Sequence, residues 1–135
     1  MIERDLTPKL REAAKAFPAV TVTGPRQSGK STLCRRTFPK HAYANLEAPD
    51  VRAFAQEDPR AFLGQFQGGA IIDEIQRCPE ITSYLQERID EDSKPGKWIL
   101  TGSQNLALLE SVNQSLAGRT RVLHLLPLAW NEVLR

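Results

Sequence analysis

The stretch GPRQSGKST, residues 24–32, decides how the rest of this chain is interpreted. Gly24 and Gly29 flank four residues, and a lysine and two hydroxyl residues follow. The pattern GxxxxGK[ST] is therefore complete, and it comes directly after the β-branched run AVTVT at residues 19–23. A strand, such a loop and a helix form a phosphate cradle, because the glycines let backbone N–H groups turn inward and the helix N-terminus attracts anions. The sequence therefore predicts a nucleotide-binding loop.

The residues of this loop have separate expected tasks. Lys30 is expected to place its charge at the β- and γ-phosphates, and the Ser31 hydroxyl is placed to ligate Mg²⁺. Thr32 is expected beside the α-phosphate. The predicted nucleotide-binding residues are Gly24, Pro25, Arg26, Gln27, Ser28, Gly29, Lys30, Ser31 and Thr32.

A second motif, AIIDEIQ at residues 70–76, is an apolar run that ends in two adjacent carboxylates. Ligands of parallel sheets bind beyond the carboxyl ends of the strands, so Asp73 is predicted to hold Mg²⁺, directly or through a water. Glu74 is predicted to act as general base on the water that attacks the γ-phosphate. The alternative is that both carboxylates only cap the next element at a solvent edge. The sequence contains no guanine-reading [NT]KxD motif, so ATP is the expected nucleotide.

Apolar runs alternate with helical patterns along the whole chain. Strands are predicted at residues 19–24, 41–47, 68–74, 97–103 and 121–128. Helices are predicted at residues 5–16, from the phosphate loop through Arg36, at 49–66 with a division at Pro59, at 79–91 and at 105–116. This alternation predicts an α/β fold with a mainly parallel sheet and helices on both faces.

The composition is that of an ordinary globular domain. The chain has 135 residues, of which 41% are apolar and 25% charged, and its formal net charge is +2. This length fits one domain, and the charge is too small to indicate nucleic acid or an anionic membrane as a partner. Cys34 and Cys78 form no CxxC pair and are expected to be free thiols in a reducing compartment. No apolar run reaches about 18 residues, so we expect a soluble, cytoplasmic protein.

Five segments in order resemble a known family. They are GPRQSGKSTL, YANLEAPDVR, IIDEIQRCPE, WILTGSQN and SLAGRTRVLHLLPLAWNE. Together they resemble the prokaryotic AAA+-superfamily ATPases that carry an N-terminal ATPase domain and a separate C-terminal domain of poorly defined function. The resemblance covers almost the whole chain. It implies a three-layer P-loop fold of the additional-strand type (ASCE), a five-stranded sheet in the order 5-1-4-3-2, and Mg²⁺-dependent hydrolysis of ATP to ADP and phosphate.

The resemblance also implies two further catalytic residues. Ser103, at the end of the fourth predicted strand, resembles the polar sensor-1 residue that touches the γ-phosphate or the attacking water. Thr101 and Gln104 replace it if the register differs. Arg119 in LAGRT resembles an arginine finger, which stabilises transition-state charge on the ATP of a neighbouring subunit. Simpler alternatives stay open, because TGSQN is rich in turn formers and a single arginine before a strand is usually solvated.

The end of the chain departs from the family pattern. Family members continue through a helical lid, which covers the adenine and supplies a sensor-2 arginine, and then through the C-terminal domain. This sequence stops at PLAWNEVLR, where the lid would begin. We therefore expect residues 1–135 to be a single core domain, truncated before the lid. The apolar segment LLPLAW would then lose part of its cover, which favours self-association.

Two other functions stay compatible with the sequence. DEIQ at residues 73–76 resembles the DExQ motif of helicases, although a helicase needs two tandem motor domains. The non-enzymatic alternative is an interaction module that binds ATP without turnover. The basic run CRRTFPKH, residues 34–41, is most simply a solvated face, so this domain alone is not expected to bind nucleic acid. His41 and His124 lack ligand partners at metal spacing and are not expected to bind a metal.

Overall fold

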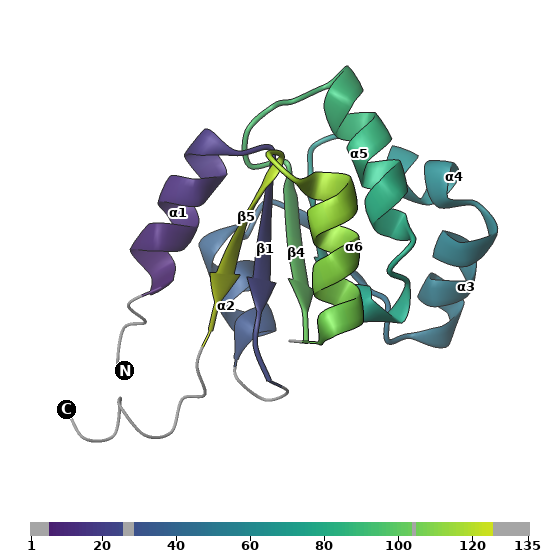
Figure 1. Cartoon of the computed structure of the whole chain (residues 1–135), viewed down its shortest axis with the longest axis horizontal. Helices are drawn as coiled ribbons and strands as arrows, with labels where there is room; N and C mark the ends of the chain where they lie inside the picture. The colour runs from purple at the N-terminus through teal and green to yellow at the C-terminus, as the bar shows by residue number, and fades with distance from the viewer. Residues whose placement is uncertain (1–5, 26–28, 104, 126–135) are drawn as a thin grey trace.

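The computed structural model describes residues 6–25, 29–103 and 105–125, and Figure 1 shows their arrangement. The strands are β1 (Ala19–Thr23), β2 (Ala42–Asn45), β3 (Ala70–Asp73), β4 (Trp98–Gly102) and β5 (Thr120–His124). The helices are α1 (Leu6–Ala16), α2 (Lys30–Thr37), α3 (Pro49–Glu57), α4 (Pro59–Gly64), the 3₁₀ turn η1 (Ile75–Arg77), α5 (Ile81–Glu91) and α6 (Leu106–Leu116). Strands and helices therefore alternate as the hydrophobic pattern predicts.

The strands form one sheet in the order β2-β3-β4-β1-β5, and each pairing between them is parallel. This is the predicted order, 5-1-4-3-2, read from the opposite edge. Parallel neighbours need a crossover connection, and each connection here contains at least one helix. The predicted α/β fold of the P-loop type is confirmed.

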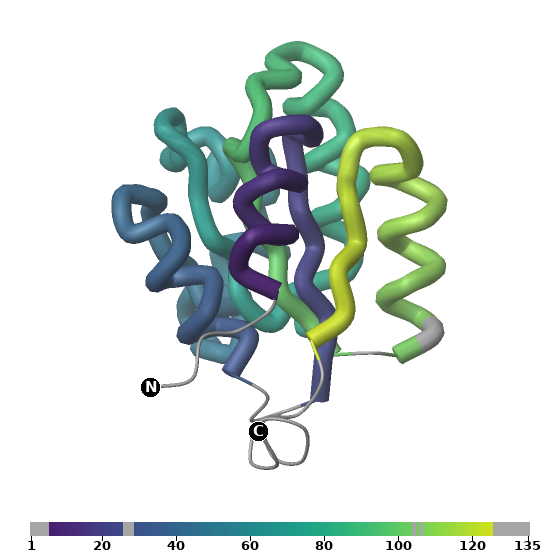
Figure 2. Tube along the Cα trace, turned by 90° about the vertical axis from the view of Figure 1, so that its left-hand side faces the viewer, coloured from purple at the N-terminus to yellow at the C-terminus, as the bar shows by residue number. Residues whose placement is uncertain are grey.

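Alternate residues of the buried strands pack against opposite faces of the sheet, which gives the molecule three layers. The central strands direct Val20, Val22, Ile71 and Ile99 toward α1 and α2. They direct Ala70, Ile72, Trp98 and Leu100 toward the opposite layer, α3 to α6. Figure 2 looks onto the face that α1 and α2 cover. Because both faces are covered, the central strands are buried along their whole length, as near-continuous apolar runs require.

The division of the helical pattern at Pro59 is confirmed, and its cause is local. Asp58 ends α3 and also caps α4, because its Oδ1 accepts a hydrogen bond from the backbone N–H of Ala61 at 3.1 Å. Pro59 then takes the first helical position, where its missing N–H costs nothing. One polar side chain and one proline therefore set the break between the two helices.

Other element boundaries differ from the sequence prediction by a few residues. The second strand ends at Asn45 rather than at residue 47, because Asn45 Oδ1 accepts the Glu47 N–H at 2.9 Å and turns the chain. The helix predicted over residues 79–91 begins at Ile81, after a turn. The turn η1 was not predicted at all. The strand predicted over 121–128 is β5, and its residues from 126 onward lie outside the described part.

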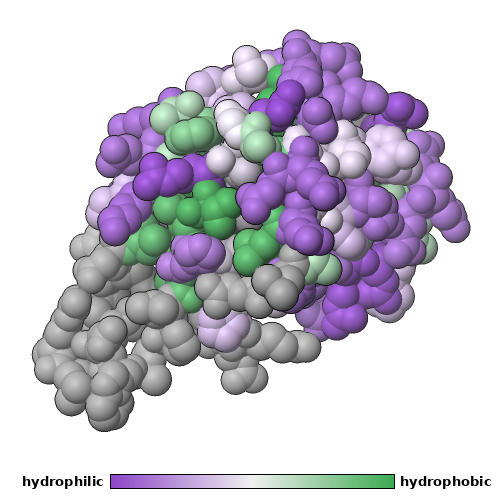
Figure 3. Space-filling model, in the orientation of Figure 1, coloured by the Kyte–Doolittle hydropathy of each residue, from purple (hydrophilic) through white to green (hydrophobic). Residues whose placement is uncertain are grey.

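Within the described residues, β5 pairs only with β1 and forms one edge of the sheet. Figure 3 shows apolar surface gathered between α1 and α6, on the side of the molecule where β5 runs. The predicted self-association depends on LLPLAW, which lies largely outside the described residues, so it stays a prediction. None of the described helices is long and apolar enough to cross a bilayer.

Cys34 and Cys78 are buried, and neither forms a disulfide. Burial raises the pKa of both thiols to about 12, because a thiolate would lose its hydration there. For Cys34 the negative charge of Asp73 adds to this effect. Both cysteines are therefore free and buried, and the reducing compartment expected from the sequence stays a prediction.

Candidate functional site

The strand ends that carry the sequence motifs lie together. The glycine-rich loop follows β1, Asp73 ends β3, and Ser103 follows β4. Because the sheet is parallel, these ends share its carboxyl edge, where ligands of such sheets bind. The Gly24 N–H donates to the carbonyl oxygen of Gly102 at 3.2 Å, which joins the start of the loop to the end of β4.

The loop ends at Gly29, which caps α2 with a φ of 86°. Side chains other than glycine rarely adopt this left-handed conformation, so the motif's second glycine is needed for the turn into the helix. The first N–H groups of α2 have no helical acceptor and leave a positive end for an anion. The predicted residues Arg26, Gln27 and Ser28 lie outside the described part of the chain.

Lys30 is a buried cation with loosely placed partners. Its side chain is 6% exposed, and its Nζ lies 3.6 Å from Oε1 of Glu74, whose side chain is 15% exposed. The same Nζ lies 3.5 Å from the carbonyl oxygen of Pro25. Both distances exceed the 2.7–2.9 Å, approximately, of a tight charge-assisted hydrogen bond. Among the described residues, the ammonium therefore makes no tight charge-assisted hydrogen bond.

Asp73 is the most densely bonded side chain of the site. Its Oδ2 accepts the hydroxyl of Ser31 at 2.6 Å and the hydroxyl of Tyr43 at 2.5 Å. Its Oδ1 accepts the hydroxyl of Thr101. Asp73 is only 4% exposed, and a buried carboxylate is stable when donors surround it in this way. Three strands and one helix therefore fix its orientation.

The metal site predicted from the sequence is consistent with this geometry. The Ser31 hydroxyl and the Asp73 carboxylate meet at 2.6 Å, and both line a cavity of about 350 Å³ with Gly29, Lys30, Thr32, Tyr43, Asn45, Glu47 and Glu74. Oxygen ligands of this kind suit Mg²⁺, which usually binds one or two carboxylates plus substrate phosphates and water. No set of three or more His, Cys, Asp or Glu side chains in the described residues could hold a metal without such help.

Tyr43 was not predicted as a site residue. Burial raises the pKa of its phenol, and the hydrogen bond to Asp73 raises it further, so the hydroxyl stays a donor. The Arg35 guanidinium lies 4.3 Å from the centre of the Tyr43 ring. Tyr43 precedes Asn45 by two residues on β2, and Asn45 pairs with Asp73 across the sheet. The register that pairs Asn45 with Asp73 is the signal that would have indicated Tyr43. It can be used only when β2 and β3 are known to be neighbours.

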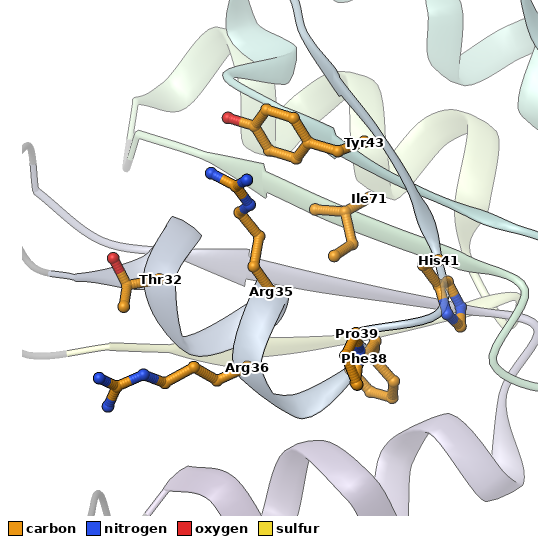
Figure 4. Close-up of a pocket in the computed structure, with 8 residues that line it drawn as sticks. All are labelled: Thr32, Arg35, Arg36, Phe38, Pro39, His41, Tyr43 and Ile71. Carbon is orange, nitrogen blue, oxygen red and sulfur yellow. The ribbon is translucent and has the colours of Figure 1, made fainter.

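A second groove, of about 380 Å³, lies on the other side of Tyr43 and includes part of the basic run 34–41. Figure 4 shows Arg35 reaching toward the Tyr43 ring, while Arg36 points away from both. The Nε2 of His41 is hydrogen-bonded to the Gly96 carbonyl at 2.7 Å. The basic groups of this run therefore do not converge on one point. We predicted from the sequence that this domain alone does not bind nucleic acid, and this stays a prediction.

Glu74, the predicted base, has a special backbone conformation. Its φ of 58° and ψ of 50° are left-handed, and it is the sole non-glycine residue with positive φ in the described part of the chain. Its N–H donates to the Thr101 hydroxyl at 3.1 Å, which helps to hold this conformation. Strained backbone of this kind is found mostly at functional sites. The carboxylate points to Lys30 through one oxygen and to Gln76 through the other.

The predicted sensor residue, Ser103, contacts the site through its backbone. Its N–H donates to Oε1 of Gln76 at 3.1 Å, and its hydroxyl accepts from the Asn105 side chain at 3.0 Å. Of the two alternatives, Thr101 reaches Asp73 directly, and Gln104 lies outside the described residues. The structure therefore brings Thr101 to the carboxylate and Ser103 to Gln76, and which of them senses phosphate stays a prediction.

Arg119 lies away from these groups. It directly precedes β5, and its carbonyl accepts the N–H of Ala19 at the start of β1, so it lies at the amino edge of the sheet. Its guanidinium is bonded to both carboxylate oxygens of Asp90 on α5, at 2.7 and 3.1 Å. Within one chain Arg119 does not reach the cavity, so its predicted role requires the site of a neighbouring copy.

Comparisons with known proteins agree with the fold and identify the family. A family model described as an AAA domain matches residues 16–134. Uncharacterized proteins of Mycobacterium bovis and of Mycobacterium tuberculosis are each 34% identical over 131 residues, 96% of this chain and 30% of theirs. A Walker-type ATPase of Pyrococcus abyssi matches with a TM-score of 0.58 at 19% identity, over 94% of this chain and 54% of that one. The chain thus spans less than a third of the length of these curated relatives.

Proposed function

This chain belongs to the AAA domain family, and from that premise we propose that it binds ATP together with Mg²⁺ and hydrolyses it to ADP and phosphate. The observation that carries the proposal is the 2.6 Å contact between the Ser31 hydroxyl and Asp73, beside the buried Lys30. Ser31 and Asp73 lie 42 positions apart in the sequence. Their convergence with a cation on one cavity provides a phosphate site and a metal site together.

In this proposal each side chain has a defined role. Lys30 and the free N–H groups at the start of α2 bind the phosphate tail of ATP. Ser31 and Asp73 would hold Mg²⁺, and the bound ion would supply positive charge to the phosphoryl group that is transferred. Tyr43 and Thr101 keep the Asp73 carboxylate in its orientation. The site is therefore preorganised by hydroxyl groups before any ligand arrives.

Glu74 is proposed as the base. A water oxygen attacks the γ-phosphorus, the bond from that phosphorus to the bridging oxygen breaks, and the water's proton passes to the Glu74 carboxylate. ADP leaves with the electron pair of the broken bond. The 15% exposure of Glu74 gives a water access to it, while Asp73 beside it is more deeply buried.

Glu74→Gln is the variant that tests hydrolysis. The amide keeps the size of the side chain but cannot accept the proton, so we expect phosphate release to fall by about 10²- to 10⁴-fold. ATP binding is expected to be retained, because Lys30, Ser31 and Asp73 are intact. Glu87→Gln, which alters an exposed carboxylate paired with Arg60, is the matched control. Undiminished phosphate release by Glu74→Gln would contradict the proposed role of Glu74.

One observation favours a second candidate, a module that binds ATP without turnover. Arg119 is held by Asp90 within its own chain, and no arginine of the described residues lines the cavity. Turnover that needs an arginine from a neighbouring copy should rise steeply with protein concentration. ATP binding with no phosphate release, even at high concentration, would support the module over the hydrolase.

A further inference from the structure

Gln76 bridges the proposed base and the loop after β4. Its side-chain Nε2 donates to Oε2 of Glu74 at 3.0 Å, and its Oε1 accepts the backbone N–H of Ser103 at 3.1 Å. The direction of both bonds follows from chemistry, because a carboxylate only accepts and a backbone N–H only donates. The amide of Gln76 is therefore oriented without ambiguity, and it spans two segments that are separated in the sequence.

The local backbone explains how Gln76 reaches both partners. The left-handed conformation of Glu74 turns the chain out of β3, and the turn η1 starts immediately, so that Gln76 faces back toward Glu74. Gly102 leaves the necessary space at the end of β4. A Cβ on Gly102 would lie 3.1 Å from Oε1 of Gln76 and 2.5 Å from Cδ2 of Leu108. The left-handed backbone of Glu74 and the absence of a side chain at Gly102 therefore both allow Gln76 to reach its two partners.

We propose that Gln76 is a positioning residue, which holds the Glu74 carboxylate away from Lys30 and ties it to the loop that begins at Ser103. The inference rests on the proposed function and deepens it. Oε1 of Glu74 lies 3.6 Å from the Lys30 ammonium, while Oε2 is held by Gln76. Without that hold, the buried carboxylate moves onto the ammonium and forms a closer ion pair. The site then loses its correctly placed base.

Two variants separate the two hydrogen bonds. Gln76→Glu keeps the oxygen that accepts the Ser103 N–H but replaces the donor to Glu74 with a second negative charge. Gln76→Leu removes both bonds with little change in volume. Gln56→Glu is the matched control, because Gln56 is an exposed residue of α3 and the charge change is the same. A merely structural role at the loop would be preserved in Gln76→Glu and lost in Gln76→Leu.

The kinetic test uses Mg·ATP as substrate and a fluorescent ATP analogue for binding. For Gln76→Glu and Gln76→Leu we expect kcat to fall by about 10- to 100-fold, with nucleotide affinity changed by no more than about threefold. Exchange of the Ser103 amide proton should accelerate in Gln76→Leu and stay slow in Gln76→Glu. Retention of the parent kcat by Gln76→Glu, with a loss in Gln76→Leu, would overturn the positioning of Glu74 and leave only a loop contact.

A further measurement does not depend on turnover. The side-chain amide resonance of Gln76 should shift in Glu74→Ala, while that of Gln56 stays in place. An unchanged Gln76 resonance would show that the contact does not form and would overturn the inference. The kinetic outcomes also separate two failures. If Glu74→Gln is inactive and Gln76→Glu matches the parent, the inference alone fails. If Glu74→Gln is as active as the parent, Glu74 is not the base, and the inference falls with that role.

Discussion

The carboxyl and amino edges of the sheet both carry charged pairs, but in opposite settings. At the carboxyl edge, the side chains of Lys30 and Glu74 are 6% and 15% exposed. At the amino edge, those of Arg119 and Asp90 are 30% and 51% exposed, with a shorter separation of 2.7 Å. The better geometry thus belongs to the more solvated pair.

The difference indicates what each edge contributes. An exposed pair exchanges water contacts for protein contacts and gains little, whereas a buried pair must compensate the loss of hydration. At a separation of 3.6 Å, the attraction between Lys30 and Glu74 does not fully compensate their loss of hydration. We infer that the carboxyl edge retains its buried charges for a ligand, and that the amino edge only fastens α5 to the start of β5.

The largest effect is expected for Asp73→Asn. The amide nitrogen cannot accept hydroxyl hydrogen bonds or ligate Mg²⁺, so the Mg²⁺-dependent part of ATP affinity should fall by about 100-fold or more, beyond the usual effect of outer-shell changes. Binding of a fluorescent ATP analogue, titrated with and without Mg²⁺, measures this. Asp92→Asn, at an exposed carboxylate of the amino edge, should bind as the parent does. Equal losses in both variants would erase the contrast.

A smaller effect is expected for Tyr43→Phe. The ring and its stacking with Arg35 remain, but Asp73 loses one of three hydroxyl donors. We expect the Mg²⁺ concentration for half-saturation of ATP binding to rise by about tenfold, as is typical of outer-shell partners. Tyr84→Phe, on α5, is the control. An unchanged Mg²⁺ requirement in Tyr43→Phe would mean that Ser31 and Thr101 suffice to orient the carboxylate.

The smallest effect is expected at the amino edge. Arg119→Ala, Asp90→Ala and the double variant should each unfold within about 3 °C of the parent, because exposed ion pairs contribute little. Nucleotide binding should not change in any of them. The unfolding midpoints of all three variants measure this effect. A midpoint lowered by much more than about 3 °C would show that the ion pair contributes substantially to the stability of the fold. If phosphate release alone falls in Arg119→Ala, the arginine acts on a neighbouring copy.

The elements that the sequence predicted well are those set by local signals. The glycine-rich loop, the acidic end of β3 and the break at Pro59 each depend on neighbouring residues. The alternation of helices and strands predicted a parallel sheet, and the strand order came from the family resemblance. Tyr43 and Gln76 could not be assigned in the same way. Their contacts with Asp73, Glu74 and Ser103 join different segments, through strand register and through a left-handed residue that no pattern indicates.

The limit was different for Arg119. LAGRT was interpreted through a family resemblance, whereas the intrachain contact of Arg119 with Asp90 depends on how α5 packs against α6. Ser103 shows the same limit. The sequence predicted the correct edge of the sheet for it, but did not indicate which of its atoms faces the site. Local patterns thus predicted where the site lies, and long-range packing decided which atoms meet there.

The most direct measurement is thermal unfolding of the parent, Lys30→Ala and Lys40→Ala, each with and without Mg·ATP. A ligand at 100 times its Kd adds about 2.7 kcal/mol to the free energy of unfolding, roughly 10 °C for a domain of this size. We expect this rise for the parent and for Lys40→Ala, whose lysine is exposed, and almost none for Lys30→Ala. The same rise in Lys30→Ala, or none in the parent at saturating ATP, would contradict the central claim that this edge of the sheet is a nucleotide site.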